Sequence, residues 1–290
     1  MNKVQKLNTG LSIPILGFGT YKISNREKIF EVVDIALDVG YRHFDSAVCY
    51  RNESHIGEAL KELLPKYNLR REDIFITSKI IPTLNQREAE VTSIVKRSLQ
   101  NLQIDYIDLY LIHWPGVSGI NVTSSENKSY RKMTWSALAK LHKSGHCRSI
   151  GVSNYNVSHL EELLADCDGV PPSVNQCEWH PRYHQPELAK FCRQHNIFLQ
   201  AYSSLGTSDN LRLLNDSTVF GIAEKIGRTS AQVLLRWAYQ QDIGILPKAS
   251  SRTHIEENFD LNFELSAEDI NLLNNLNVTE KYAWDPTVVV

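Results

Sequence analysis

The sequence predicts an α/β protein that folds as a single closed (β/α)8 barrel, also called a TIM barrel. Three observations lead to this prediction. Short apolar runs alternate with longer amphipathic runs along nearly the whole chain. Several of the short runs, such as IDLYLIH, are apolar on both faces, as parallel strands covered on both sides are. No linker rich in Pro, Gly or Ser divides the 290 residues, so we expect one domain over 1–290.

Eight short runs are predicted to be the strands of the barrel. In chain order they are Ile15–Gly19, Tyr41–Asp45, Ile74–Lys79, Ile107–His113, Ser149–Ser153, Ser173–Glu178, Ile197–Tyr202 and Ile243–Pro247. The competing fold is a doubly wound open sheet, which carries a glycine-rich turn after its first strand. The segment at Gly17–Lys22 lacks the third glycine of that turn, and no P-loop is present. The barrel is therefore favoured.

Amphipathic segments with helical periodicity lie between these strands. They are Arg26–Val39, His55–Leu64, Gln86–Leu102, Tyr130–Lys143, Val157–Asp166, Gln185–His195 and Thr229–Gln240. Gly40 and Gly145 stand where a C-terminal helix cap is expected. A segment between them, 116–132, is polar and rich in Gly and Ser, and it reads as a flexible rim loop.

Composition and charge exclude several classes of protein. The formal net charge of −2 argues against a nucleic-acid partner. No apolar run is long enough for a membrane helix, and we expect no signal peptide at the N-terminus. The five cysteines include no CxxC pair, so zinc and a disulfide framework are not expected, and reduced thiols indicate a cytoplasmic location. No feature suggests an interface, and we expect a monomer.

Four ionisable residues fall at or just after predicted strand ends. They are Asp45, Tyr50, Lys79 and His113. Catalytic groups of a barrel come from the C-terminal ends of its strands, so all four are expected to face one mouth. Asp45 would hold Lys79 charged, and the ammonium would lower the pKa of the Tyr50 phenol. His113 would hydrogen-bond a substrate oxygen or take part in proton transfer.

Each of these residues taken alone also has a structural interpretation. Asp45 can cap a turn, Tyr50 can pack as an aromatic, Lys79 can be solvated, and His113 can be a satisfied buried histidine. Four such groups at successive strand ends are harder to explain by structure alone. Together they can protonate an oxygen that gains negative charge, as a carbonyl oxygen does when hydride adds to its carbon.

At these residues the sequence resembles the aldo-keto reductase superfamily. The motifs HFDSAVCYRNE, ITSK, DLYLIHWP, IGVSNYN, NQCEWHP, AYSSLG and LPKASSRTHIEEN carry the resemblance, which runs from Gly17 to Pro286. It implies a (β/α)8 barrel with an N-terminal β-hairpin and extra C-terminal helices. It also implies NADPH-dependent reduction of aldehydes and ketones to alcohols, with Tyr50 as proton donor and Asp45, Lys79 and His113 completing the catalytic tetrad. No metal is implied.

The resemblance also implies a cofactor site. Ser153, Asn154 and Gln176 match the residues that hold the carboxamide, and Tyr202 matches the aromatic that stacks on the nicotinamide. Gly19, Thr20 and Tyr21 lie near this end of the site. Ser203, Leu205 and Gly206 match the loop at the pyrophosphate. The adenosine end matches Lys248, Ser250, Ser251, Arg252, His254, Glu257 and Asn258.

Two departures from the family pattern bear on the choice of cofactor. His254 stands where many members carry an arginine aimed at the 2′-phosphate, and Arg252 stands where proline is common. Lys248 and Arg252 would pair with a 2′-phosphate, so NADPH is expected, with NADH as the weaker alternative. Arg252 is a candidate to replace the missing arginine.

The resemblance places Tyr21, Val48, Cys49, His113 and Trp114, together with Ile81, around the substrate. Tyr21 replaces a common tryptophan, which implies a wider apolar pocket. The tail after Trp284 is short, so the pocket is expected to be open, unless the tail packs on the barrel. The substrate is a small-molecule carbonyl, and aldehydes, α-ketoaldehydes, sugars and prostaglandin-type ketones all remain open. Two other functions remain as alternatives, a nicotinamide-binding regulatory or structural subunit and a cofactor-free hydrolase or lyase that uses Asp45 and His113.

Overall fold

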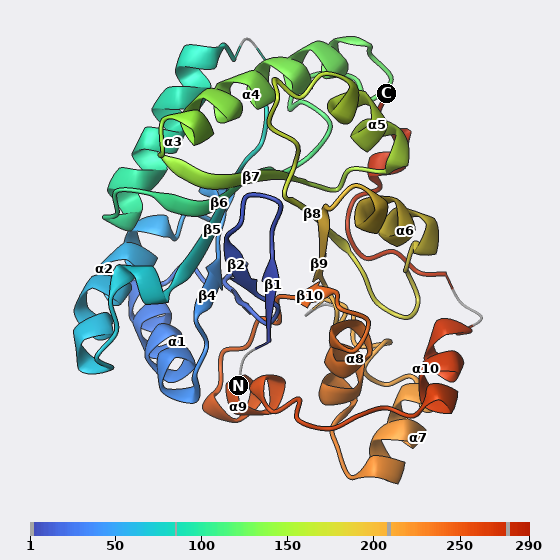
Figure 1. Cartoon of the computed structure of the whole chain (residues 1–290). Helices are drawn as coiled ribbons and strands as arrows, with labels where there is room; N and C mark the ends of the chain where they lie inside the picture. The colour runs from blue at the N-terminus through green and yellow to red at the C-terminus, as the bar shows by residue number, and fades with distance from the viewer. Residues whose placement is uncertain (1–2, 85, 208–209, 277–278) are drawn as a thin grey trace.

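A closed parallel barrel forms the centre of the molecule (Figure 1). The structure is a computed structural model that describes residues 3–84, 86–207, 210–276 and 279–290. Its eight strands lie in sequence order around the sheet: β3 (Phe18–Gly19), β4 (His43–Asp45), β5 (Phe75–Ile80), β6 (Ile107–Ile112), β7 (Cys147–Ser153), β8 (Val174–Glu178), β9 (Phe198–Tyr202) and β10 (Gly244–Ile245). A parallel bridge between Leu16 and Ile245 closes the ring. The predicted fold class and all eight strand positions are confirmed.

The first and last strands are shorter than predicted because they form the seam. The Ile245 amide donates to the Ile15 carbonyl at 2.8 Å, and the Gly17 amide donates to the Ile245 carbonyl at 2.9 Å. On one side of this seam the Ile243 amide is already bonded to the end of the preceding helix at Ala238. On the other side Pro247 has no amide hydrogen to offer. Few ladder bonds are left, so each strand is assigned only two residues.

An N-terminal hairpin covers the bottom of the barrel, where Figure 1 shows it across the centre. It consists of β1 (Val4–Lys6) and β2 (Ser12–Pro14), paired antiparallel. Ile13 and Ile15 are fully buried in a cluster with barrel residues that include Leu109 and Leu111. The hairpin that the family resemblance implied is confirmed, and it closes the end of the barrel opposite the strand C-termini.

The helices surround the barrel and bury their apolar faces against it. The predicted ones are α1 (Arg26–Val39), α2 (Glu53–Lys66), α3 (Glu88–Leu102), α4 (Glu126–Lys143), α5 (Val157–Ala165), α6 (Pro186–Gln194) and α8 (Ser230–Tyr239). The implied extra C-terminal helices are α9 (Arg252–Phe259) and α10 (Ala267–Asn274), and short 3-10 turns lie at Val48–Tyr50, Arg71–Asp73 and Pro286–Val288. Gly40 caps α1 with φ 116°, as expected.

Two helix predictions were incomplete. The helix α7 (Ser217–Ile226) was not predicted, although Asp216 caps it by accepting from the Thr218 and Val219 amides. The helix α4 begins at Glu126, so the second half of the expected rim loop is helical. The buried Asn127 side chain explains this order, because its amide group donates to the Asn121, Val122 and Ser124 carbonyls and its oxygen accepts from the Val117 amide.

Candidate active site

Four polar side chains meet at the mouth of the barrel. Asp45 is the last residue of β4, Lys79 lies near the end of β5, and His113 directly follows β6. Tyr50 ends the 3-10 turn that follows β4. Neighbouring parallel strands end on the same side, so these residues are brought together as the sequence predicted. Alternation along β5 turns Lys79 inward, while the Ser78 hydroxyl bonds Glu53 on α2 at 2.7 Å.

The Lys79 ammonium is buried and has three partners. It lies 2.6 Å from Asp45 Oδ1 and 2.9 Å from the Ser46 carbonyl, and it donates to the Tyr50 hydroxyl at 3.4 Å. The second Asp45 oxygen accepts from Gln176 Nε2 at 2.9 Å. The side chains of Lys79 and Asp45 are 0% and 5% exposed. Burying two charges is tolerated here because they neutralise each other and both are further hydrogen-bonded.

The expected lowering of the Tyr50 pKa is wrong for this arrangement. Burial raises the pKa of Tyr50 well above 10.0, and the negative charge of Asp45 raises it further. Burial is the main cause, and the negative charge of Asp45 also offsets the Lys79 charge that was expected to favour the phenolate. Tyr50 is therefore a protonated phenol across the physiological pH range, and its hydroxyl contacts the Lys79 ammonium group.

The His113 imidazole is uncharged. Burial first, and then the charge of Lys79, lower the pKa of His113 well below 6.5. Its ring lies edge-on to Tyr50, with the centroids 5.9 Å apart. Its Nδ1 lies 3.6 Å from the Cys49 sulfur. The backbone on both sides is fixed, because the His113 amide donates to the Ile80 carbonyl and Asn154 Nδ2 donates to the His113 carbonyl.

A ladder of amide and hydroxyl groups continues around the mouth from β7 to β9. Asn154 Nδ2 donates to Ser153 Oγ at 3.0 Å, and Ser153 Oγ donates to the Gln176 carbonyl at 2.7 Å. The Tyr202 hydroxyl donates to Asn154 Oδ1 at 2.7 Å. Asn154 adopts a left-handed backbone, φ 66°, which turns its side chain back into the ladder. The ladder meets the tetrad where Gln176 bonds Asp45.

The loop after β9 is built for a tight turn. Ser203 and Gly206 both have positive φ, 52° and 81°, and the Gly206 amide donates to the Ser203 carbonyl at 2.8 Å. Leu205 packs against the core. The buried hydroxyl of Ser204, which lies between Ser203 and Gly206 in the chain, has no hydrogen-bonding partner among the described residues. A buried donor without a partner at this loop fits a bound polar group.

At the seam, the backbones of the first and last strands approach each other closely. A Cβ added to Gly19 would lie 2.8 Å from the Leu246 carbonyl oxygen, so only glycine fits. Thr20 is fully buried and donates to the Asp45 carbonyl at 2.8 Å. These two residues therefore connect the Asp45 end of the site to the segment after β10.

That segment leads into α9 and carries the residues expected at the adenosine end. Lys248 is exposed and has no ion-pair partner in the described part of the chain. Arg252 is engaged, because its guanidinium donates to Asp38 at 2.8 Å and to Glu256 at 3.1 Å. Ser250, His254 and Glu257 lie at the surface or part-buried, and Asn258 is buried. The Ser251 hydroxyl caps α9 by accepting from the His254 amide. Within the described residues, a cation without an ion pair at Lys248 and a buried hydroxyl without a partner at Ser204 fit a bound polar cofactor.

Aromatic residues lie beside the tetrad. Tyr21 is 57% exposed, and its ring lies 5.0 Å from that of Tyr50. Val48 is also exposed. Trp114 stacks on His113 and meets Trp284 edge-on, with the two indole centroids 4.9 Å apart. Trp284 was not assigned a site role from the sequence.

The tail packs on the barrel, which was the alternative left open. His159 Nε2 contacts the Val289 carbonyl at 3.0 Å, and Arg131 donates to the Val290 carbonyl at 2.9 Å. Upstream, the buried Glu178 side chain accepts from the Ala283 amide at 2.9 Å and pairs with Lys281. These anchors on both sides of Trp284 hold its indole against Trp114.

The sequence also gave no role to Asn52, which ties two loops of the site together. Its Nδ2 donates to the Thr20 carbonyl at 3.0 Å and to the Ile23 carbonyl at 2.9 Å, and its Oδ1 accepts from Ser46. The loop that carries Tyr50 is thereby fixed to the loop after β3. In the sequence the only signal was an asparagine two residues after Tyr50, and its burial is seen in the structure alone.

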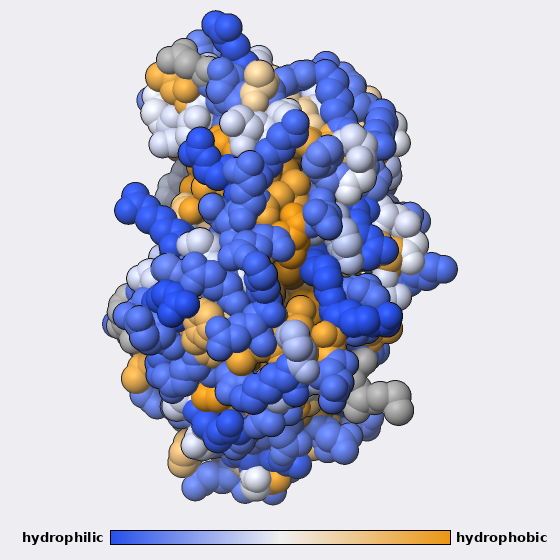
Figure 2. Space-filling view, turned by 90° about the vertical axis from the view of Figure 1, so that its left-hand side faces the viewer, coloured by the Kyte–Doolittle hydropathy of each residue, from blue (hydrophilic) through white to orange (hydrophobic). Residues whose placement is uncertain are grey.

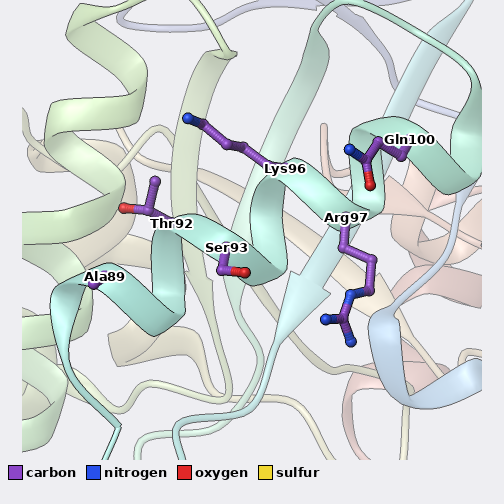
Figure 3. Close-up of a pocket in the computed structure, with 6 residues that line it drawn as sticks. All are labelled: Ala89, Thr92, Ser93, Lys96, Arg97 and Gln100. Atoms are coloured by element: carbon purple, nitrogen blue, oxygen red, sulfur yellow. The ribbon is translucent and has the colours of Figure 1, made fainter.

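Two surface cavities lie away from this cluster. One of about 370 Å³ lies on the outer face of α3 and is lined by Ala89, Thr92, Ser93, Lys96, Arg97 and Gln100 (Figure 3). A second, of about 270 Å³, lies between α2 and α3 and shares only Val48 with the expected site. Figure 2 shows this flank as hydrophilic, with a recessed strip of hydrophobic residues. Side-chain chemistry, and not cavity size, locates the candidate site.

The mouth of this closed (β/α)8 barrel holds a buried lysine–carboxylate pair, a phenol and a neutral imidazole. This arrangement is typical of (β/α)8-barrel enzymes, whose catalytic groups lie at the C-terminal ends of the strands. The model of the Aldo/keto reductase family matches residues 15–278. The chain is 41% identical over 284 residues to the glyoxal reductase of Bacillus subtilis (strain 168), covering 97% of this chain and 95% of that protein. It is 38% identical over 301 residues to aldo-keto reductase family 1 member A1-A of Danio rerio, covering 98% and 92%. The solved aldose reductase of Schistosoma japonicum superposes with a TM-score of 0.86 at 37% identity, covering 96% and 93%.

The chain therefore belongs to the aldo/keto reductase family. Members of this family are oxidoreductases that use nicotinamide cofactors and act on small carbonyl compounds. No helix in the described part of the chain is long and apolar enough to cross a membrane.

Proposed function

We propose that the protein is an NADPH-dependent reductase of aldehydes and ketones in which Tyr50 donates the proton. The observation that carries this proposal is the contact of the protonated Tyr50 hydroxyl with the buried Lys79 ammonium, 3.4 Å apart. The nicotinamide supplies the hydride when it is bound. Ser153, Asn154 and Gln176 would hold its carboxamide, and Tyr202 would support the ring face.

The residues of the chain then handle the oxygen of the substrate. When hydride adds to the carbonyl carbon, the substrate oxygen would become an alkoxide. An alkoxide oxygen is a far stronger base than a phenolate, so Tyr50 can give up its proton despite its raised pKa. Lys79 stabilises the phenolate that remains, and Asp45 keeps Lys79 in place. The neutral His113 can donate one N–H to the same oxygen, which orients the carbonyl.

Lys248 supports the preference for NADPH, because it is an exposed cation at the adenosine end and no carboxylate among the described residues neutralises it. Arg252 supports it less than the sequence suggested, because Asp38 and Glu256 already share its charge. Ser203, Leu205 and Gly206 would contact the pyrophosphate, with Ser250, His254, Glu257 and Asn258 around the adenosine. NADH is the weaker alternative.

We also propose that the protein works as a monomer in the cytoplasm on a small-molecule carbonyl. All five cysteines are free thiols, which fits a reducing compartment. The apolar wall of Tyr21, Val48 and Trp114 suits aldehydes and ketones with an apolar part. One relative is named glyoxal reductase, so a dicarbonyl belongs in the first set of substrates.

The test is a panel of carbonyls followed by NADPH absorbance, with Tyr50→Phe as the decisive variant. We expect Tyr50→Phe to lower kcat by at least about a hundredfold, the range for a lost general acid. Cofactor binding, followed by quenching of tryptophan fluorescence, should change little. Tyr239→Phe on α8 is the matched control, because it removes a phenol hydroxyl outside the site. Retention of most activity by Tyr50→Phe would refute the assignment.

A further inference from the structure

The Cys49 thiol touches the imidazole of the site. Its sulfur lies 3.6 Å from His113 Nδ1, within the range of a hydrogen bond that involves sulfur. Cys49 precedes Tyr50 in the 3-10 turn after β4, and although the residue is exposed, the contact of its sulfur with His113 is part-buried. His113 Nε2 has no hydrogen-bonding partner among the residues that the structure describes. The thiol is therefore the one side-chain group in this set that can act on the ring through Nδ1.

A neutral imidazole carries one proton, and its position decides what the ring can do. Burial and Lys79 keep His113 neutral. With the proton on Nε2, the ring offers an N–H toward the mouth and can donate to a carbonyl oxygen. With the proton on Nδ1, Nε2 is only an acceptor and cannot orient a carbonyl. The hydrogen bond at one ring nitrogen selects between these two tautomers.

We propose that Cys49 is a positioning residue that donates its S–H to His113 Nδ1 and thereby holds the ring as the Nε2–H tautomer. This inference rests on the proposed reduction for its catalytic consequence, but the contact itself does not depend on it. Neither the comparisons nor the family resemblance assigns this role to Cys49.

The chemistry of sulfur sets the direction of this hydrogen bond. A thiol sulfur is a weak acceptor, whereas the lone pair of imidazole is a good one, so S–H to nitrogen is better than N–H to sulfur. Burial raises the pKa of Cys49, so the thiol keeps the proton it must donate. A thiolate would reverse the bond and draw the proton to Nδ1.

The test measures the tautomer directly. The protein contains 10 histidines, and labelling their rings with ¹⁵N allows two-bond ¹H–¹⁵N spectra, in which His113 is assigned by its loss in His113→Asn. We expect the Nε2–H pattern in the unmodified protein. Cys49→Val should lose the preference for this tautomer. Cys49→Thr should restore it, because threonine has nearly the shape of valine but carries a hydroxyl in place of one methyl group. Cys49→Ala serves as a second variant without a donor.

Kinetics then connect the tautomer to the reaction. Cys49→Val should lower kcat/KM for a carbonyl about fivefold, as the loss of one hydrogen bond does, with Cys49→Thr recovering most of the loss. Quenching of tryptophan fluorescence by NADPH should be unchanged in both variants. An unchanged Nε2–H pattern in Cys49→Val and Cys49→Ala would overturn the proposal, as would a changed pattern with full activity. If the unmodified protein reduces no carbonyl, the proposed function fails, and the spectra alone decide the role of Cys49.

Discussion

The buried pair of Lys79 and Asp45 gives a quantitative prediction that separates folding from chemistry. Lys79→Met leaves the Asp45 carboxylate without its cation, in a site where the two side chains are 0% and 5% exposed. Removal of one partner from such a buried pair costs about 3–5 kcal/mol of the free energy of unfolding. Asp45 keeps its bond from Gln176 at 2.9 Å, so we expect the lower part of this range.

The double variant Asp45→Asn/Lys79→Met is the control for this prediction. It removes both charges and keeps nearly the original side-chain volumes, so no uncompensated charge remains. We expect it to regain most of the stability that either single variant loses, because replacing a whole buried pair is often close to neutral. It should nevertheless reduce no carbonyl, since nothing remains to stabilise the Tyr50 phenolate.

Urea unfolding at pH 7, followed by far-ultraviolet circular dichroism, measures the unmodified protein, Lys79→Met, Asp45→Asn and the double variant, and it yields the coupling energy. A Lys79→Met variant within about 1 kcal/mol of the unmodified protein would show that the pair is not buried as described. A double variant less stable than both single variants would refute the argument from uncompensated charge.

Three further predictions concern titration and the cofactor. Burial lowers the pKa of His43 to about 4. As the pH falls from about 6.5 toward 4, the unfolded chain binds a proton at His43 before the folded protein does, so about 3 kcal/mol of the free energy of unfolding is lost. Urea midpoints that do not fall between pH 7 and 4 would contradict this prediction. Burial raises the pKa of Cys49, so inactivation by iodoacetamide should be slow at pH 7 and should accelerate above pH 9. The Cys49→Ser variant should stay active under the same treatment, and equal rates of inactivation at both pH values would contradict the prediction. Lys248→Ala should weaken NADPH binding about tenfold and leave NADH binding unaffected. Asp38→Asn, which leaves Arg252 paired with Glu256 alone, should strengthen NADPH binding. Fluorescence titration measures both, and equal use of the two cofactors by the unmodified protein would defeat the preference.

Much of the fold could be predicted because the periodicity of the chain is a local property. The strands β5 and β6 are apolar on both faces, and the bounds of α1 are as predicted. Errors occurred where distant contacts decide the outcome. The ends of the seam strands depend on which amides meet across the ring, and the start of α4 depends on the buried Asn127.

The same distinction holds for the site. The meeting of Asp45, Lys79 and His113 follows from strand ends, which the sequence reveals. The direction of the Tyr50 pKa shift does not, because it depends on burial and on how completely Asp45 offsets Lys79. Trp284 could not be placed either, since its position depends on where residues far along the tail dock.

Asp45 has a consequence for how the two halves of the site communicate. One of its oxygens holds Lys79, and the other holds Gln176, which would bind the carboxamide. If a bound carboxamide draws the Gln176 side chain away, the Asp45 carboxylate loses that hydrogen bond and interacts more strongly with Lys79. Thermodynamic linkage requires the reverse as well, so neutralising Lys79 must change the affinity for the cofactor. The carboxylate would then be a coupling element, through which loading of the cofactor adjusts the acidity of the proton donor.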